Sequence, residues 1–396
     1  MSSPCLACDG VLGETFFSIP DLPLVDSFCK FVDDAKAVPK YPIDLRQCST
    51  CDTIQIASPP DTSSIYRNYI YESGTSPDLL RHFTEYAKFV RSTIGGTSGR
   101  VLEIGANDGL LLDQLVKSGF HQLIAIDPSP QTGRIRMPGV TVINEFFSKD
   151  SISSLPSQGF AAIIANNCFS HIPRLTSVLE MCGRLLDRSG TIFVEVQSTL
   201  DLVENVIFDY VYHEHYFYHT VSSFEKIAKA AGLELYGVKH VATKGGSYRL
   251  LIGHRGEHAR HGSLEYWKYR EEISGIHSAT PWIFLESYLK DVKGKLHRWL
   301  AVQSRPVFGY GASATGTVFM RYMEIERYVT AIIDDNPKRQ RLFAPGSAIP
   351  TLPPDALQNG DRCLVLAWRH SQQIIPALES RGIGYVLPLP MLTIHD

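Results

Sequence analysis

The pattern of apolar and polar positions predicts alternating helices and strands through the middle of the chain. Apolar residues recur at helical spacing from Leu79 to Ile94. A buried strand, Arg100–Ile104, follows, breaks at Gly105, and gives way to a helix from about Leu110 to Ser118. Helical stretches such as Leu175–Leu186 then alternate with short apolar runs at 122–127, 140–143, 160–165 and 190–195. This alternation predicts an α/β domain with a parallel, doubly wound sheet, the Rossmann-like arrangement.

A second unit of similar pattern follows a predicted connecting helix, about Trp282–Ala301. Residues 305–311 are expected to form a strand that enters a turn, followed by a helix at 314–323 and strands at 328–333 and 362–367. Its glycines are spaced Gly309-x-Gly311-x4-Gly316, which differs from a dinucleotide-binding turn. The amino end of its helix can still accept a substrate phosphate. The substrate-binding residues predicted at this turn are Tyr310, Ala312 and Ser313.

Four cysteines near the amino end, Cys5, Cys8, Cys48 and Cys51, form two Cys-x2-Cys pairs. Two such turns can direct four thiolates at one Zn²⁺ ion, and a filled shell makes that ion structural. Between the pairs, residues 9–47 can hold a hairpin. Reduced thiols without a metal and a redox pair remain alternatives. The other cysteines are expected to be small core residues: Cys29, Cys168, Cys182 and Cys363.

Length and composition limit the class of protein. A chain of 396 residues predicts two or three domains, here 1–66, 67–300 and 301–396. Its net charge of −3 gives no reason to expect nucleic acid as a partner. The sequence shows neither an apolar run long enough to span a membrane nor the pattern of a signal peptide at residue 1. A cytoplasmic protein with reduced thiols is therefore expected.

Three predicted strand ends carry polar groups that suit a nucleotide-like cofactor. The first is Glu103-x-Gly105-x-Asn107-Asp108-Gly109, the second ends at Asp127, and the third at Asn166-Asn167. Asp127 can accept both hydroxyls of a ribose. Glu103 and Asp108 would repel a pyrophosphate but tolerate a sulfonium with an amino-acid tail, so S-adenosylmethionine is favoured over NAD. A plain tight turn without a ligand is the alternative.

Three histidines and four tyrosines fall within residues 208–219. Within this segment, Tyr212-His213-Glu214-His215 offers an imidazole base, a carboxylate and a phenol. A base with a pKa near 7 suits removal of a proton next to a carbonyl, and phenol or imidazole N–H groups can hold the enolate oxygen. A metal on the His-x-His pair lacks an evident third ligand, and simple packing of an aromatic cluster stays open.

A glycine-rich turn, residues 243–249, precedes a strand expected at 248–252. Lys244, Ser247 or Arg249 could contact an anionic group of the substrate there. A tight turn with an exposed arginine explains the same residues.

Taken together, these motifs resemble those of the S-adenosylmethionine-dependent C-methyltransferases that act on nucleotide-linked 4-keto-deoxysugars, in particular the C-3 methylating enzymes. The likeness covers essentially the whole chain. It includes the four-cysteine module and the segment from Tyr71 to His82, and Asn166-Asn167 with His171 beyond it. It continues through Glu195, Tyr-His-Glu-His, Gly-Gly-Ser-x-Arg and the turn at 309–316. Thr315 stands where the family usually has lysine, and the residues after His215 also differ.

The resemblance implies a structural zinc and a middle domain that binds S-adenosylmethionine, with Tyr71 among the contacts. It implies a C-terminal domain that helps to hold the nucleotide sugar, and a monomer. His215 would be the base, assisted by Tyr212 and Glu214, and the enolate would be held by Tyr212 and His213. Three rivals remain: a zinc-bearing binding protein, an NAD-dependent sugar oxidoreductase, and methyl transfer to oxygen or nitrogen.

Overall fold

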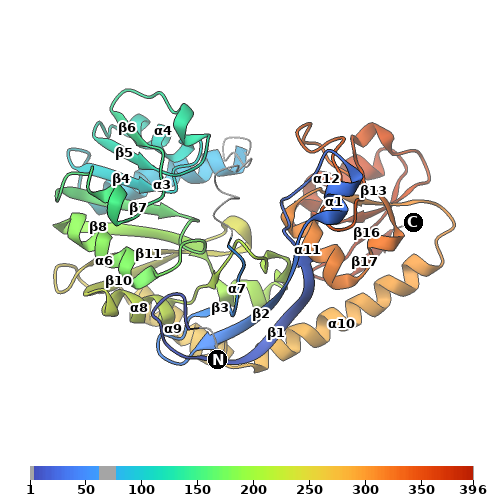
Figure 1. Ribbon diagram of the computed structural model, residues 1–396, viewed down its shortest axis with the longest axis horizontal. Helices are drawn as coiled ribbons and strands as arrows, with labels where there is room; N and C mark the ends of the chain where they lie inside the picture. Colours follow the sequence, from blue (N-terminus) through green and yellow to red (C-terminus); the bar gives the residue numbers. More distant parts are fainter. Residues whose placement is uncertain (1–3, 62–76, 396) are drawn as a thin grey trace.

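The computed structural model describes residues 4–61 and 77–395. Figure 1 shows two lobes, joined along one side by the long helix α10 and crossed by the hairpin of β1 and β2. The larger lobe is built on a seven-stranded sheet and the smaller on a six-stranded sheet. Within the described parts of the chain, no helix combines the length and the apolarity needed to cross a bilayer.

A four-stranded antiparallel sheet begins at the amino end. Its strands are β1 (Leu12–Pro23), β2 (Lys40–Cys48), β3 (Ile54–Ile56) and β9 (Phe217–Tyr218), in the order β1-β2-β3-β9. The predicted hairpin is confirmed, with Ile19 opposite Ile43, and the short helix α1 (Val32–Ala37) lies between its strands in the chain. Because β9 comes from the histidine-rich segment, this sheet joins the amino-terminal module to that segment.

The seven-stranded sheet has the order β10-β11-β8-β7-β4-β5-β6. Its strands are β4 (Arg100–Ile104), β5 (Leu123–Ile126), β6 (Val140–Ile143), β7 (Phe160–Asn166), β8 (Leu186–Gln197), β10 (Leu233–Val241) and β11 (Ser247–His254). The prediction of a parallel sheet is correct for β4 to β8. The strand expected at 248–252, for which no direction was predicted, is β11, and it runs antiparallel to both neighbours. The α/β, Rossmann-like fold is therefore confirmed, with a mixed sheet.

Helices cover both faces of this sheet. They are α3 (Pro77–Thr93), α4 (Leu110–Lys117), α5 (Lys149–Ile152), α6 (Leu175–Leu185), α8 (Val221–Ala230) and α9 (Gly262–Ser274). The short helix α7 (Thr199–Glu204) instead places Leu202 in a cluster with Trp282. One buried cluster contains apolar residues of α3 and α4, and another contains those of α6 and α8. Burial on two faces explains why the strands of this domain are continuous apolar runs in the sequence.

The smaller lobe follows α10 (Thr280–Ala301) and has the strand order β14-β13-β12-β15-β16-β17. Its elements are β12 (Val307–Tyr310), α11 (Ala314–Met323), β13 (Val329–Ile333), β14 (Thr351–Leu352), β15 (Arg362–Val365), α12 (Ser371–Glu379), β16 (Gly384–Leu387) and β17 (Thr393–His395). Only its last strand, within the described residues, is antiparallel.

One hydrophobic cluster spans the two lobes. It contains Ile19 and Ile43 of the hairpin, Phe208 of the histidine-rich segment, Trp282 of α10 and Phe319 of α11. The predicted boundary at 66/67 lies outside the described residues, and α10 ends at the predicted boundary at 300/301. Because the cluster is shared, the hairpin and the smaller lobe are packed as one body against the histidine-rich segment.

Candidate active site

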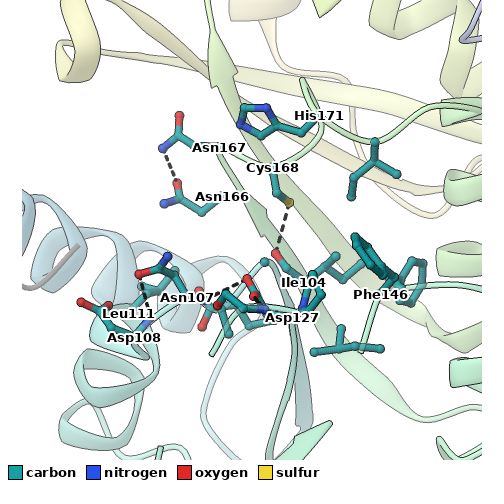
Figure 2. Close-up of a pocket in the computed structure, with 18 of the residues that line it drawn as sticks. Ile104, Asn107, Asp108, Leu111, Asp127, Phe146, Asn166, Asn167, Cys168 and His171 are labelled. Atoms are coloured by element: carbon teal, nitrogen blue, oxygen red, sulfur yellow. Dashed lines mark hydrogen bonds between the residues drawn. The ribbon is translucent and has the colours of Figure 1, made fainter. Parts of the chain in front are cut away.

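A cavity of about 420 Å³ opens at the carboxyl ends of β4, β5 and β7 (Figure 2). We call it the strand-end cavity. Glu103, Asp127 and Asn166, from three neighbouring strands, contribute to its wall, as does Asn167. Ligands of open α/β sheets bind at this edge, and the volume suits a small organic ligand.

The turn after β4 needs a glycine because its backbone packs directly against Cys168. Gly105 has φ of +78°, and a Cβ on it would lie 2.7 Å from the Cβ of Cys168. Asn107 is also left-handed, with φ of +51°, and its amide donates to Asp127 Oδ2 at 3.1 Å. Asp127 Oδ1 accepts from the Ser129 amide at 2.6 Å. Gly109, with φ of +79°, begins α4 and faces Ile135 rather than the cavity. The predicted turn is therefore held in shape by Asp127.

Four carboxyl groups line the strand-end cavity: Asp61, Glu103, Asp108 and Asp127. Glu103 is only 3% exposed, and its Oε2 has no hydrogen-bond partner among the described residues. Burial, together with the charges of Asp127 and Asp108, raises the pKa of Glu103 well above its ordinary value. A buried carboxyl oxygen that lacks a hydrogen-bond partner favours a cationic ligand group beside it, as the sulfonium and ammonium of S-adenosylmethionine would provide.

Two features of the cavity are absent from the sequence-based prediction. Phe146 and Phe147, which follow β6, form part of its apolar wall. An aromatic pair directly after a strand was the available signal. Cys168 lines the cavity and donates its thiol to the Ile104 carbonyl at 3.2 Å. The prediction that every remaining cysteine is a core residue is correct for Cys182 and Cys363 but wrong for Cys168 and Cys29, which are half-buried.

Two imidazoles, His171 and His215, lie together at the same cavity with ring centroids 4.9 Å apart. His215 Nδ1 is 2.9 Å from the Tyr210 carbonyl, and His171 Nδ1 is 2.6 Å from the Glu214 carbonyl. Because a carbonyl only accepts, the Nδ1 of His215 carries the hydrogen in the neutral ring and its Nε2 keeps its lone pair. Burial lowers the pKa of His171 to about 4 and that of His215 well below its ordinary value. Both rings are therefore neutral near pH 7.

Two further polar groups lie beside His215. The Tyr212 ring centroid is 4.1 Å from that of His215, and both residues line the cavity with Lys244. Lys244 sits in the 3-10 helix η4 (Thr243–Gly245) with a left-handed backbone, φ +55° and ψ +28°. Its pKa is lowered by burial, which Glu195 opposes. A phenol and an amine thus lie on the same wall as the neutral base.

The structure does not bring His213 or the Glu214 side chain to the strand-end cavity. His213 is buried and donates Nε2–H to the Tyr41 carbonyl of β2 at 3.1 Å. Burial raises the pKa of Glu214 to about 8, and the charge of Asp26 adds to this while Arg339 opposes it. These contacts tie the histidine-rich segment to the amino-terminal module. The sequence did not distinguish them from catalytic contacts because consecutive residues of an irregular segment can face any direction.

Ser247 and Arg249 are likewise turned away from the cavity. Ser247 is buried and donates to the Thr243 carbonyl. Arg249 is buried against Glu195 of β8, with Nη2–Oε2 at 2.6 Å, and its guanidinium lies 3.4 Å from the centroid of the Tyr86 ring. The alternative interpretation, a tight turn with an exposed arginine, is therefore wrong. Among the three candidate residues of this turn, only Lys244 lines the cavity.

The three predicted residues of the smaller lobe lie at the carboxyl end of β12. Tyr310 donates its hydroxyl to Asp335, and the Ala312 amide donates to Asp334 Oδ2 at 2.7 Å. Ser313 caps α11 by accepting from the Gly316 amide at 3.0 Å. None of the three lines the strand-end cavity. Tyr71 lies outside the described residues.

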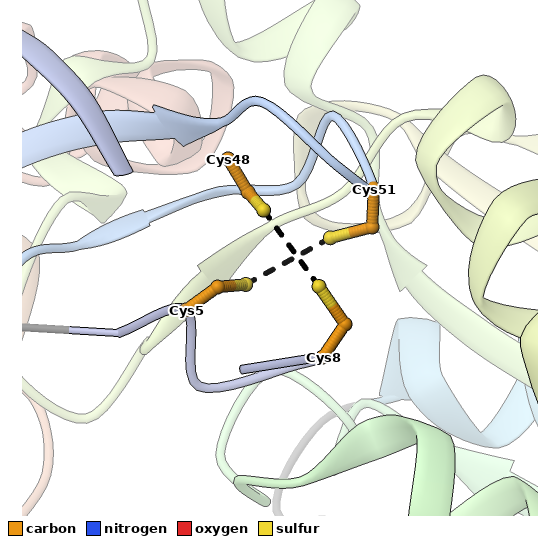
Figure 3. Close-up of side chains that lie close together, drawn as sticks. All are labelled: Cys5, Cys8, Cys48 and Cys51. Atoms are coloured by element: carbon orange, nitrogen blue, oxygen red, sulfur yellow. Dashed lines mark hydrogen bonds between the residues drawn. The ribbon is translucent and has the colours of Figure 1, made fainter. Parts of the chain in front are cut away.

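The four amino-terminal cysteines converge, as Figure 3 shows. Their sulfurs all lie within 4.8 Å of one another, and the Cys5–Cys51 and Cys8–Cys48 pairs are both 3.7 Å apart. A disulfide would need about 2.05 Å. Tetrahedral coordination with Zn–S bonds of about 2.3 Å separates the sulfurs by roughly 3.8 Å. The donor set therefore fits one tetrahedral metal ion.

Comparison with known proteins identifies the class of enzyme. Residues 79–238 match the family described as a methyltransferase domain, and residues 242–390 match the one described as the C-terminal domain of C-methyltransferases. The C-methyltransferase NovU of Streptomyces niveus is 24% identical over 388 residues, which cover 94% of this chain and 92% of NovU. The ubiquinone biosynthesis O-methyltransferase of Xanthomonas oryzae pv. oryzae is 28% identical over 118 residues, 28% of this chain and 48% of that protein.

Among solved structures, the 1,6-didemethyltoxoflavin-N1-methyltransferase of Burkholderia thailandensis, with bound S-adenosylhomocysteine, aligns with a TM-score of 0.37 at 15% identity. The alignment covers 53% of this chain and 93% of that one. The chain is an S-adenosylmethionine-dependent methyltransferase whose C-terminal part matches that of C-methyltransferases.

Proposed function

We propose that this methyltransferase adds a methyl group to carbon, next to the ketone of a nucleotide-linked 4-keto-deoxysugar. The observation that supports this most directly is a neutral His215 with a free Nε2 on the wall of the acid-lined cavity. A neutral imidazole can remove the proton of an acidic C–H group. The full-length similarity to a C-methyltransferase supports carbon as the acceptor.

S-adenosylmethionine would supply a methyl group on a cationic sulfur, which an electron-rich carbon takes up by displacement. Glu103 would face the cationic end of S-adenosylmethionine. Asp127 would accept hydrogen bonds from the ribose hydroxyls with its remaining lone pairs. Asp108, Asn107, Asn166 and Asn167 line the rest of the polar wall, while Phe146 offers an apolar surface to a base. Tyr71 remains a predicted contact.

Asp127→Asn should weaken S-adenosylmethionine binding by about 10- to 100-fold, because a hydrogen bond to a charged group contributes roughly 1.5–3 kcal/mol. Isothermal titration calorimetry measures the change. Asp150→Asn, at an exposed position of α5, is the matched control and should bind normally. Unchanged affinity in Asp127→Asn would remove this carboxylate from the cofactor site.

In the proposed reaction, His215 Nε2 takes the proton of the carbon next to the ketone. The electrons of that C–H bond form the C=C bond of the enolate, and the π pair of the C=O bond moves to the oxygen. Tyr212 and Lys244 would hold the resulting enolate oxygen, in place of His213, which lies elsewhere. The enolate carbon would form the new C–C bond as the methyl–sulfur bond of the donor breaks, with the electron pair left on the sulfur of S-adenosylhomocysteine. His215 would then release its proton to water. Each of these donors stabilises the negative charge on the oxygen more strongly the better the folded protein already points it at that oxygen.

The test is an assay of the purified protein with S-adenosylmethionine and a panel of nucleotide-linked 4-keto-deoxysugars that differ in base and ring substituents. Mass spectrometry and NMR of the product should show one new methyl bound to carbon. A methyl bound to oxygen or nitrogen would overturn carbon transfer, and failure of every keto sugar to react would overturn the substrate class.

The nucleotide part of the substrate would bind at the smaller lobe, near Tyr310, Ala312 and Ser313. Since the Asp334 carboxylate already occupies the Ala312 amide, this turn suits ribose hydroxyls better than a phosphate. The protein would act as a monomer. The four cysteines would hold one structural Zn²⁺, because four thiolates fill a tetrahedral shell and leave no position for a substrate.

A further inference from the structure

A buried carboxylate joins the smaller lobe to the segment that carries His215. Asp209 is fully buried, and its Oδ2 accepts from Trp368 Nε1 at 3.0 Å while its Oδ1 accepts from Arg369 Nη1 at 2.6 Å. Both partners lie in the 3-10 helix η7 (Trp368–His370), just after β15. A buried charge that is paired and hydrogen-bonded is costly to disturb, so this contact fixes the two segments relative to each other.

The contact continues to the imidazole through one residue. Asp209 and Tyr210 belong to the 3-10 helix η3 (Phe208–Tyr210), and the Tyr210 carbonyl accepts the Nδ1–H of His215. The guanidinium of Arg369 lies 4.4 Å from the centroid of the Tyr210 ring, on the same short turn. The contacts of Asp209 therefore hold the short turn whose next carbonyl decides which nitrogen of His215 keeps its lone pair.

We propose that Trp368 and Arg369 position the His215 imidazole through Asp209 and Tyr210, so that docking of the smaller lobe completes the base. This inference rests on the proposed function, in which His215 removes the proton. None of Asp209, Trp368 and Arg369 lines the strand-end cavity, so they are positioning residues rather than catalytic ones. The base is then in its productive orientation only when the lobe expected to carry the nucleotide is in place.

Trp368→Phe is the sharpest test, because it removes one N–H donor and keeps an aromatic ring. We expect kcat to fall about tenfold with the affinity for S-adenosylmethionine unchanged. Arg369→Ala should lower kcat further than Trp368→Phe does, and Arg369→Lys should restore part of that lost kcat. Tyr288→Phe is the matched control, since it also removes one donor, to the Pro390 carbonyl, but has no route to His215.

The pH profile separates positioning from a general loss of stability. The groups that act on His215 are His171, Lys244, His219, Tyr210 and Tyr212, and every variant keeps them. Burial holds the pKa of His215 low; a loosened ring gains water, and its pKa rises toward the ordinary value. The acid limb of kcat against pH should therefore move to higher pH in Trp368→Phe and Arg369→Ala but not in Tyr288→Phe.

The positioning role would be overturned if Trp368→Phe behaved like Tyr288→Phe. It would also be overturned if the loss of kcat followed the loss of thermal stability while the acid limb of the pH profile stayed in place. His215→Ala distinguishes this from failure of the proposed function. If His215→Ala keeps full activity, the assigned base is wrong. If it is inactive while the acid limb stays fixed in the Trp368 and Arg369 variants, only the positioning inference fails.

Discussion

Replacing His215 by alanine is expected to lower kcat for methyl transfer by roughly 10²- to 10⁴-fold, the contribution of a general base. Its Nε2 is the free nitrogen of a neutral ring on the cavity wall, and the other nitrogen is held by the Tyr210 carbonyl. Binding of S-adenosylmethionine should be unchanged, because that cofactor is expected to contact the acidic end of the cavity. Turnover with the keto sugar and calorimetry with the cofactor measure the two effects separately.

The wild-type pH profile gives an independent check of the same base. Since burial lowers the pKa of His215, the neutral form should persist below the ordinary histidine value of about 6.5. Activity should therefore rise with pH and level off below that value. His121→Asn, at an exposed histidine outside the cavity, should behave as the wild type. An acid limb that is identical in His215→Ala would assign it to another group.

Loss of the proposed Zn²⁺ ion is expected to have the largest effect on stability. Cys48→Ser removes one of the four sulfur ligands and should cost on the order of 5 kcal/mol or more, since structural zinc contributes directly to folding free energy. The loss should reach the active site. The turn between Cys5 and Cys8 contains Leu6 and Ala7, whose carbonyls accept from the amides of Arg174 and Thr176 at the start of α6.

Metal analysis, thermal melting and activity should change together in Cys48→Ser. Cys29→Ser is the matched control, because Cys29 is a half-buried free cysteine outside the cluster. It should keep one zinc per chain and nearly the wild-type melting temperature. The structural metal would be contradicted if the wild-type protein were purified without zinc and its melting temperature were unchanged by a chelator.

Local periodicity was enough to predict most of the regular elements. The helix expected at 79–94 is Pro77–Thr93, and the one expected at 314–323 is Ala314–Met323. The direction of a strand could not be predicted from the sequence, because a strand buried on both faces has the same apolar run whether it is parallel or antiparallel to its neighbours. The antiparallel β11 therefore appeared only in the structure.

The fate of Arg249 depends on that strand direction. Its partner Glu195 is 54 positions away, and the two face each other only because β11 pairs with β8 in antiparallel register. The sequence placed both residues among the resembling motifs but could not pair them. An arginine three residues after two glycines was therefore interpreted as a possible anion contact, whereas it forms an internal ion pair with Glu195.

The histidine-rich segment shows the same limit at the candidate site. It has only a short 3-10 turn and a two-residue strand, so no period tells which of His213 and His215 faces the cavity. His171 and Lys244 reach His215 from other parts of the chain, after β7 and before β11. The sequence identified the acidic strand ends correctly as a group because parallel strands bring their carboxyl ends to one edge.

The pairing of β3 with β9 has a consequence for synthesis on the ribosome. Strands β1, β2 and β3 are synthesised early. The second neighbour of β3 is β9, which begins only at Phe217, more than halfway along the chain. Until that neighbour appears, the nascent sheet has an unpaired edge, which invites association with other chains. Chain termination before Phe217 should therefore yield an aggregation-prone fragment rather than an independently folded module.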